Sequence, residues 1–434
     1  MVDVGIQDTS IGSSTYVKDG DTVEITAAIT GALASEISRE DITADLSGFN
    51  QGTVVAEDYD GFTATWTLTE RPEPDFAMPA DLGASLKKLL SSWNVCSKEW
   101  VIRQYDHEVQ GGSVVKPLVG AVNDGPSDAS VIRPKLGTDK GLAIANGINP
   151  KYGEIDPYHM AMSNIDEALR QITAVGGDIG KTALLDNFSW GNTTIPDRLG
   201  DLVRASQGCY DGAVGFGTPF ISGKDSLRNE FIYGDTVIRI PGTLLISAVS
   251  VMDDVTKAVT MDFKRPGNAV MAVGLTRNEL GGSHYLALHG DIGNTVPAVD
   301  TASAKRTMNA LHEAMKAGLV RSCHDCSEGG IGVAVAEMAF AGDCGVTVDT
   351  AKIPADGTIR DDYLLFSESN SRFIIEVEQD RVAVIERVLD GVPCAVIGKT
   401  TDNGRLVVNG SAGTVIDEDI VGLKKAWQDP LRSV

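Results

Sequence analysis

The sequence predicts an α+β protein in which a short all-β segment precedes two lobes of alternating helices and strands. The chain has 434 residues, and roughly 150 residues per domain gives two or three domains. Residues 22–29 and 62–68 alternate apolar and polar side chains, as a half-buried strand does. Residues 157–174 instead place Ile165, Leu169 and Ile172 on one helical stripe. From residue 113 onward both patterns alternate.

Composition limits the classes of partner. Lys and Arg number 37 and Asp and Glu number 60, so the formal net charge is −23. This charge argues against a nucleic-acid backbone or an anionic membrane as the main partner, and no apolar run is long enough to span a membrane. Nucleotide binding stays possible, because Mg²⁺ can hold phosphate without a basic surface. Six scattered cysteines and a start without signal-peptide character predict the reducing cytoplasm.

The order of patterns predicts four regions. Residues 1–69 form the β-rich segment, 70–112 a Pro-rich linker and a helix, 113–255 the first lobe, and 256–434 the second. Helices are expected at 82–91, 157–174, 196–215, 302–317, 331–341 and 381–389, and strands at 114–119, within 236–251, at 269–275 and at 372–377.

Oxygen-bearing side chains suggest a cation site. Glu167 and Gln171 are four residues apart on the predicted helix, so they share a face. A carboxylate and an amide oxygen suit a hard cation such as Mg²⁺. The same pair is also typical of a solvated helix face. Asp128, at the end of the turn that begins with Asp124, is a further candidate, although the segment also fits an ordinary turn.

A second group of candidates lies in the segment His324–Gly330, immediately before the helix at 331–341. Backbone N–H groups at a helix start bind phosphate, and Gly329 and Gly330 would let it approach. Asp325 could bind the accompanying metal. Ser327 and its neighbour also fit a simple helix cap. The Cys323–Cys326 pair lacks a second pair, so it gives weak support for zinc.

The segment Phe220–Ser226 predicts a strand running into a Gly-Lys turn. It is not a Walker A loop, because the glycine spacing is wrong and Asp225 stands where Ser or Thr is required. Lys224 is a candidate phosphate contact and Ser226 a candidate hydroxyl donor. The chain has no G-x-S-x-G elbow, no H-E-x-x-H and no dinucleotide-binding fingerprint.

Taken together and in this order, the motifs closely resemble the second half of phosphoribosylformylglycinamidine synthase, over about residues 97–431. The segments that carry the resemblance are Ser97–Gly112, Asp124–Asp128, Asn149–Pro157, Asp166–Leu169, Leu184–Asn192, Ser222–Ser226, Leu280–Ser283, His324–Gly330 and Phe366–Arg372. The resemblance implies an aminoimidazole ribonucleotide synthetase-like fold, in which two such repeats pair. It further implies an ATP-dependent C–N ligase of purine biosynthesis.

The resemblance also implies residue roles. Asp128, Glu167 and Asp325 match Mg²⁺ ligands beside a bound nucleotide, and Gln171 stands where larger members carry an Asn ligand. Ser327 matches a nucleotide contact, Asp186 and Gly223 match ATP positions of shorter members, and Ser226 matches a substrate position. No metal role is carried onto Lys224.

Catalytic residues are not assigned, because the family's catalytic histidines lie in the first repeat, which this sequence does not resemble. The implied activity is the conversion of formylglycinamide ribonucleotide to formylglycinamidine ribonucleotide with ATP. It would need a first-half partner chain and a glutaminase subunit that supplies ammonia. The isolated chain is expected to be inactive, and either to form a homodimer or to stay poorly soluble until its partner is present. The alternative is a non-catalytic half that holds Mg-ADP as a scaffold.

Overall fold

The computed structural model describes residues 5–7, 23–28, 43–45, 53–55, 58–59, 63–68, 73–234 and 236–432. The chain divides into two compact units, Met1–Pro74 and Asp75–Val434.

The first unit is built from strands in its described residues. They are β1 (Gly5–Gln7), β2 (Val23–Ala28), β3 (Thr43–Asp45), β4 (Thr53–Val55), β5 (Asp58–Tyr59) and β6 (Thr63–Leu68). A four-stranded sheet has the order β1-β2-β6-β5, and β3 pairs with β4. The two strands that alternation predicted are therefore present as β2 and β6, which pair antiparallel.

The first lobe of the second unit contains a six-stranded sheet with the order β11-β10-β14-β9-β8-β7. Its strands are β7 (Ser113–Val115), β8 (Ser130–Ile132), β9 (Gly141–Gly147), β10 (Thr182–Ser189), β11 (Phe220–Ser226) and β14 (Thr243–Met252), and a separate hairpin joins β12 (Glu230–Tyr233) to β13 (Thr236–Arg239). The strand predicted at 114–119 is shorter than expected, because regular pairing ends at Val115.

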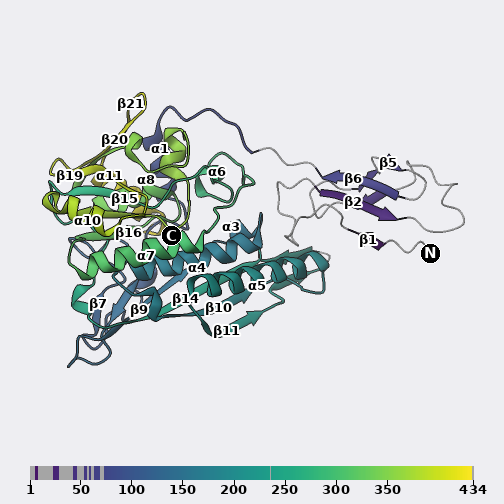
Figure 1. The fold of residues 1–434 in the computed structure, drawn as a ribbon, viewed down its shortest axis with the longest axis horizontal. Coiled ribbons are helices and arrows are strands. Elements are labelled where there is room, and N and C mark those ends of the chain that lie inside the picture. Colours follow the sequence, from purple (N-terminus) through teal and green to yellow (C-terminus); the bar gives the residue numbers. More distant parts are fainter. Residues whose placement is uncertain are drawn as a thin grey trace, which may run out of the picture. The chain divides into compact units, whose positions relative to one another are not determined.

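Two long helices accompany this sheet. α4 (Pro157–Ala174) packs on β9 and β14, and α5 (Pro196–Phe216) packs on α4 (Figure 1). α4 starts where Asp156 caps the main-chain N–H groups of the first turn. α5 ends at Gly217, whose left-handed φ of 75° suits glycine. Both helices lie where the sequence predicted them.

The prediction of a Gly-Lys turn in this lobe is wrong. Gly223 and Lys224 lie inside β11, paired in parallel with Asp186 and Asn187 of β10. A Cβ on Gly223 would come within 2.0 Å of an Asp186 carboxylate oxygen. The glycine therefore makes room for a neighbouring side chain and does not turn the chain.

The second lobe contains a seven-stranded sheet with the order β16-β18-β15-β19-β17-β20-β21. Its strands are β15 (Ala269–Val273), β16 (Ser322–Asp325), β17 (Gly345–Asp349), β18 (Phe373–Val377), β19 (Cys394–Thr401), β20 (Arg405–Gly410) and β21 (Gly413–Asp419). The helices of the second unit besides α4 and α5 are α1 (Leu82–Leu90), α2 (Glu99–Ile102), α3 (Pro150–Gly153), α6 (His284–Ala287), α7 (Thr301–Lys316), α8 (Gly330–Gly342), α9 (Asp361–Phe366), α10 (Val382–Val388) and α11 (Ile420–Arg432), with single 3₁₀ turns at Ile179–Lys181, Val255–Lys257, Thr350–Lys352 and Gln379–Arg381.

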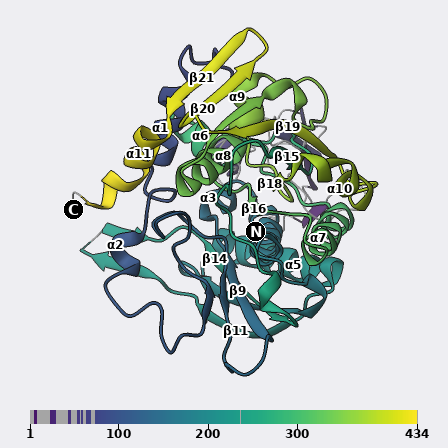
Figure 2. The same cartoon turned by 90° about the vertical axis from the view of Figure 1, so that its left-hand side faces the viewer.

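The centre of this lobe is α8, which is apolar on nearly every side and buried along most of its length. It packs against β16 and β17 and is covered by α1 and α11, which lie side by side (Figure 2). α4 of the first lobe also contacts β16. The start of α8 thus lies where the two lobes meet. In the described part of the chain, no helix combines the length and apolar character that a membrane span needs.

Candidate active site

Three separate segments bring oxygen-bearing side chains to one cleft between the lobes. Asp128 precedes β8, Glu167 and Gln171 lie on α4, Asp325 ends β16, and Ser327 lies in the turn before α8. All five residues line a cleft with about 680 Å³ of empty space that is partly open to solvent. The fold therefore brings together candidate residues that lie up to nearly 200 positions apart in the sequence.

The turn into α8 requires two glycines. Gly329 and Gly330 have φ values of 78° and 63°, a left-handed conformation that side chains disfavour. A Cβ on Gly330 would lie 2.3 Å from the carbonyl oxygen of Ser367. The Gly329 N–H donates to Oε1 of Glu368 at 2.9 Å. The Gly330 N–H donates to the Ser327 carbonyl at 2.9 Å, so the N–H groups of both glycines, which were expected to be free for phosphate, have internal acceptors.

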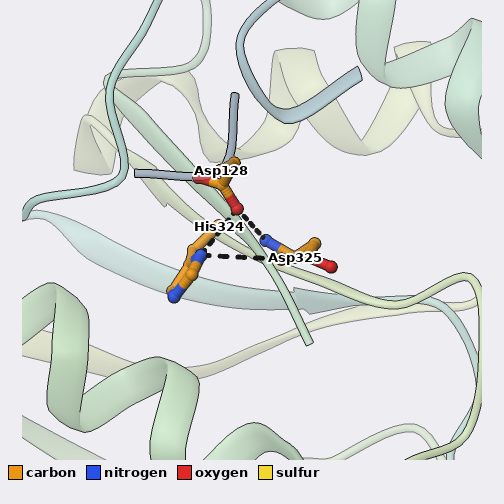
Figure 3. Close-up of side chains that lie close together, drawn as sticks. All are labelled: Asp128, His324 and Asp325. Atoms are coloured by element: carbon orange, nitrogen blue, oxygen red, sulfur yellow. Dashed lines mark hydrogen bonds and ion pairs between the residues drawn. The ribbon is translucent and has the colours of Figure 1, made fainter. Parts of the chain in front are cut away.

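Asp128 is held by a buried histidine. Nδ1 of His324 lies 2.7 Å from Oδ1 of Asp128, and Nε2 lies 2.8 Å from Oε2 of Glu337. The Asp325 N–H donates to the same Asp128 oxygen at 3.0 Å (Figure 3). Burial alone would lower the pKa of His324, but the two carboxylates outweigh it and raise the pKa well above its usual value. The two carboxylates that flank the ring therefore favour its protonated form.

Asp325 is held by a buried arginine from the other lobe. The Arg170 guanidinium donates to Oδ2 of Asp325 at 3.3 Å and to the Ser327 hydroxyl at 3.0 Å. It also forms a short ion pair with Asp166 and a hydrogen bond to Asn370. Ser327 in turn donates to Oδ2 of Asp325. The positive charge of Arg170 offsets part of the negative charge of the buried carboxylates around it.

Burial and negatively charged neighbours disfavour the ionised forms of Glu167 and Asp325 in the cleft. Burial and the neighbouring charge of Glu328 raise the pKa of Glu167 well above its usual value, although Arg170 opposes this. Burial also raises the pKa of Asp325. Oε2 of Glu167 accepts a hydrogen bond from the Ile148 N–H at 3.0 Å, which fixes the side chain. Oxygen donors crowded in this way fit a hard divalent cation, which would relieve their repulsion.

The other predicted residues lie elsewhere in the first lobe. Asp186 is on β10, and Gly223 and Ser226 are on the exposed edge strand β11. Burial raises the pKa of Asp186, whose carboxylate accepts a main-chain hydrogen bond from Lys224. The Lys224 ammonium contacts the Ser226 hydroxyl. The lining of the α8 cleft includes none of these residues.

Four polar residues around the cleft had no role predicted from the sequence, namely Arg170, His324, Glu337 and Glu368. A local signal did exist for two of them. Arg170 follows Glu167 by three positions on the same helix, and Glu337 is a charged residue within the otherwise apolar helix α8. The contacts Arg170–Asp325 and His324–Asp128 join residues that are 155 and 196 positions apart. Local sequence patterns do not predict contacts at such separations.

Comparison with known protein families gives two matches. Residues 126–240 match the model described as AIR synthase related protein, N-terminal domain, and residues 265–411 match its C-terminal domain. Phosphoribosylformylglycinamidine synthase subunit PurL of Deinococcus radiodurans is 34% identical over 372 residues, which are 84% of this chain and 48% of that protein. PurL of Methanocaldococcus jannaschii is 34% identical over 355 residues, 81% of this chain and 46% of its own length.

Solved structures share the fold. PurL from T. maritima, complexed with FGAR, matches with a TM-score of 0.61 at 19% identity, covering 82% of this chain and 54% of its own. Its complex with ATP gives 0.60 at 18% identity, covering 80% and 52%. The HypE–HypF complex gives 0.52 at 14% identity, covering 67% and 92%.

The chain spans about half the length of the curated relatives it matches. The two family matches cover most of both lobes, and each lobe has the sheet and helices described above. The chain belongs to the family of AIR synthase related proteins and, over most of its length, is homologous to phosphoribosylformylglycinamidine synthase subunit PurL.

Proposed function

We propose that this chain is the second-repeat part of a phosphoribosylformylglycinamidine synthase, an ATP-dependent ligase that forms formylglycinamidine ribonucleotide. The observation that supports this most is the convergence of Asp128, Glu167, Gln171 and Asp325 at the glycine turn into α8. Homology to PurL supports the reaction class. A cytoplasmic location fits the free cysteines, since all six are unpaired.

Magnesium is the metal that the donor set fits. In the proposed site, Asp128, Glu167, Gln171 and Asp325 would hold the ion, and all of them offer oxygen atoms. When bound, Mg²⁺ neutralises phosphate charge during phosphoryl transfer. The Arg170 guanidinium is already committed to Asp325 and Ser327, so it orients these side chains.

ATP or ADP would lie with its phosphates toward Ser327, Gly329 and Gly330. Ser327 and Gly330 line the cleft, and the start of the 13-residue helix α8 favours negative charge there. Asp186 and Gly223 are proposed as further nucleotide contacts and Ser226 as a substrate contact. The exposed position of β11 supports a surface that a partner repeat would complete.

Partners are part of the proposal. The matched region spans about half the length of the PurL relatives, and the proposed activity would also need the other half, which a first-half chain would supply. A related structure is PurLQS from Thermotoga maritima, with a TM-score of 0.60, 18% identity, and coverage of 83% of this chain and 53% of that one. This supports an assembly with further components, among which we place the glutaminase that supplies ammonia for formylglycinamide ribonucleotide.

A Mg-ADP scaffold is the second candidate function. His324 directs both ring nitrogens to carboxylates, and Arg170 is held by Asp166 and Asp325. Neither group is free to act on a substrate without losing these contacts. The cleft could therefore hold nucleotide without catalysing its turnover.

One experiment separates the two functions. ATP hydrolysis and amidine formation are measured for the chain alone, with a first-half synthase protein, and with added ammonia. Activity that appears only with the first half supports the synthase part. Tightly bound ADP that is not exchanged or hydrolysed under either condition supports the scaffold. If the chain binds no nucleotide in either condition, both proposals are wrong.

A further inference from the structure

Asp128, His324 and Asp325 form a group whose spacing alone fits a metal site. Each offers one ligand atom, all three atoms lie within 4.8 Å of one another, and all three residues are buried. The hydrogen bonds of His324 decide whether the imidazole can be one of the ligands.

Both nitrogens of His324 face carboxylate oxygens. Nδ1 lies 2.7 Å from Asp128 and Nε2 lies 2.8 Å from Glu337. Each ring nitrogen is therefore already within hydrogen-bond distance of a carboxylate oxygen from a different segment. A metal bound at His324 would have to displace one of these two contacts.

The same contacts order Asp128. Its Oδ1 accepts from His324 and from the Asp325 N–H at 3.0 Å, so this oxygen already has two donors. Oδ2 is then the oxygen that a cation would take. Glu337 supports this orientation, because it comes from the buried helix α8 and contacts the far side of the ring.

We infer that His324 and Glu337 are positioning residues, which aim the Asp128 carboxylate at a bound Mg²⁺ without ligating it. This inference rests on the proposed Mg-nucleotide site and extends it to two residues with no predicted role. Groups that orient a metal ligand typically contribute about 10–100-fold to metal affinity.

The test compares four single variants of the full chain. Calorimetry measures Mg-ADP affinity for His324→Gln, Glu337→Ala, Glu337→Gln and the control His289→Gln. Gln at 324 can donate through one end only, so affinity should fall about tenfold or more. Glu337→Gln keeps an acceptor for Nε2–H and should stay within about threefold, whereas Glu337→Ala should lose most of the affinity that His324→Gln loses. His289, exposed and stacked on Phe76, should have no effect.

Pulsed electron paramagnetic resonance of the unmodified chain with Mn-ADP gives a readout that does not depend on folding of a variant. We expect ³¹P couplings from the nucleotide and no coupling from a directly bound histidine nitrogen. Such a nitrogen coupling would overturn the inference, as would unchanged affinity in folded His324→Gln. If Glu167→Gln weakens binding while His324→Gln does not, the site stands and the positioning role is wrong. If the unmodified chain binds no Mg-ADP, the proposed site itself is wrong.

Discussion

The Arg170 guanidinium of the first lobe donates a hydrogen bond to the Asp325 carboxylate of the second lobe, with 3.3 Å between Nε and Oδ2. Both side chains are buried, and Arg170 also contacts Ser327 in the turn before α8. The position of the cleft's ligands therefore depends on contact between the lobes. Removing one partner of such a buried pair costs about 3–5 kcal/mol, because the other charge stays buried.

Glu167 should be the most informative single ligand to change. In Glu167→Gln the side chain keeps an acceptor for the Ile148 N–H, so the local fold should persist. The variant removes one negative charge from the proposed Mg²⁺ site. We expect Mg-ADP affinity, measured by calorimetry, to fall about tenfold or more.

Glu154→Gln is the matched control, since Glu154 is exposed and ends the short helix α3. It should leave Mg-ADP affinity unchanged. Equal affinities for the unmodified chain and a folded Glu167→Gln variant would refute the cation site at this position.

Gly330→Ala should damage the turn into α8. The new Cβ would lie 2.3 Å from the Ser367 carbonyl oxygen, which is main chain and cannot move freely. Gly357 is the control, because its φ of 81° is also left-handed but nothing lies within 4 Å of a Cβ there. Urea unfolding should show a loss of about 1–2 kcal/mol for Gly357→Ala and a larger loss for Gly330→Ala. Similar losses of unfolding free energy in the two variants would mean that the turn into α8 adjusts to accommodate the new Cβ.

Periodicity predicted the elements whose burial follows a regular pattern. α4 extends over Pro157–Ala174 as its apolar stripe indicated, and β2 and β6 lie at the predicted alternations. Segments with few regular apolar positions were less predictable. Gly223 and Lys224 suggested a turn because glycine is common there, whereas the space taken by the Asp186 side chain requires glycine within β11.

The candidate ligands were predictable as residue types, but their surroundings were not. The nucleotide and metal roles of these residues stay predictions. Pairings such as His324–Asp128 and Tyr152–Glu368 depend on how the lobes fold together, and they join residues 196 and 216 positions apart. A single sequence carries no local signal for such a contact.

The His284–Glu368 pair should make stability depend on pH. Burial alone would lower the pKa of His284, but hydrogen bonding to Glu368 and its charge raise the pKa above its usual value. The stabilisation is therefore fully present below the unfolded pKa, about 6.5, and is lost as pH rises through the raised folded value. Urea unfolding of His284→Gln should show its largest deficit, about 1–3 kcal/mol, near pH 6 and a smaller one at higher pH. A deficit that does not change with pH would contradict the pairing.

Residues 1–69 should be dispensable for nucleotide binding. The cleft is lined entirely by residues of the second unit, Asp75–Val434, and the family matches begin at residue 126. A chain that starts at residue 70 should bind Mg-ADP within about threefold of the full chain, a difference of under 1 kcal/mol. Circular dichroism provides the control for folding. Loss of binding in a folded, shortened chain would show that the first unit contributes to the site.

The first-lobe sheet presents apolar side chains on the face away from α4. Along β9 and β14, Ile144 pairs with Val249 and Leu142 pairs with Val251. Ile144 is 40% exposed and Val251 is 47% exposed. Apolar side chains in such a row favour contact with another protein surface.

We expect the isolated chain to homodimerise through this face, at a mass of twice 45.9 kDa by light scattering at about 0.15 M salt. The net charge of −23 opposes association, but screening limits that repulsion to about 8 Å. Ile144→Glu places a charge in the apolar face and should give monomers. Val421→Glu is the control, because Val421 is 66% exposed on α11 in the other lobe and should leave the dimer intact. A soluble monomer of the unmodified chain at high concentration would contradict the expected dimer, and with it the need for a second lobe against this sheet.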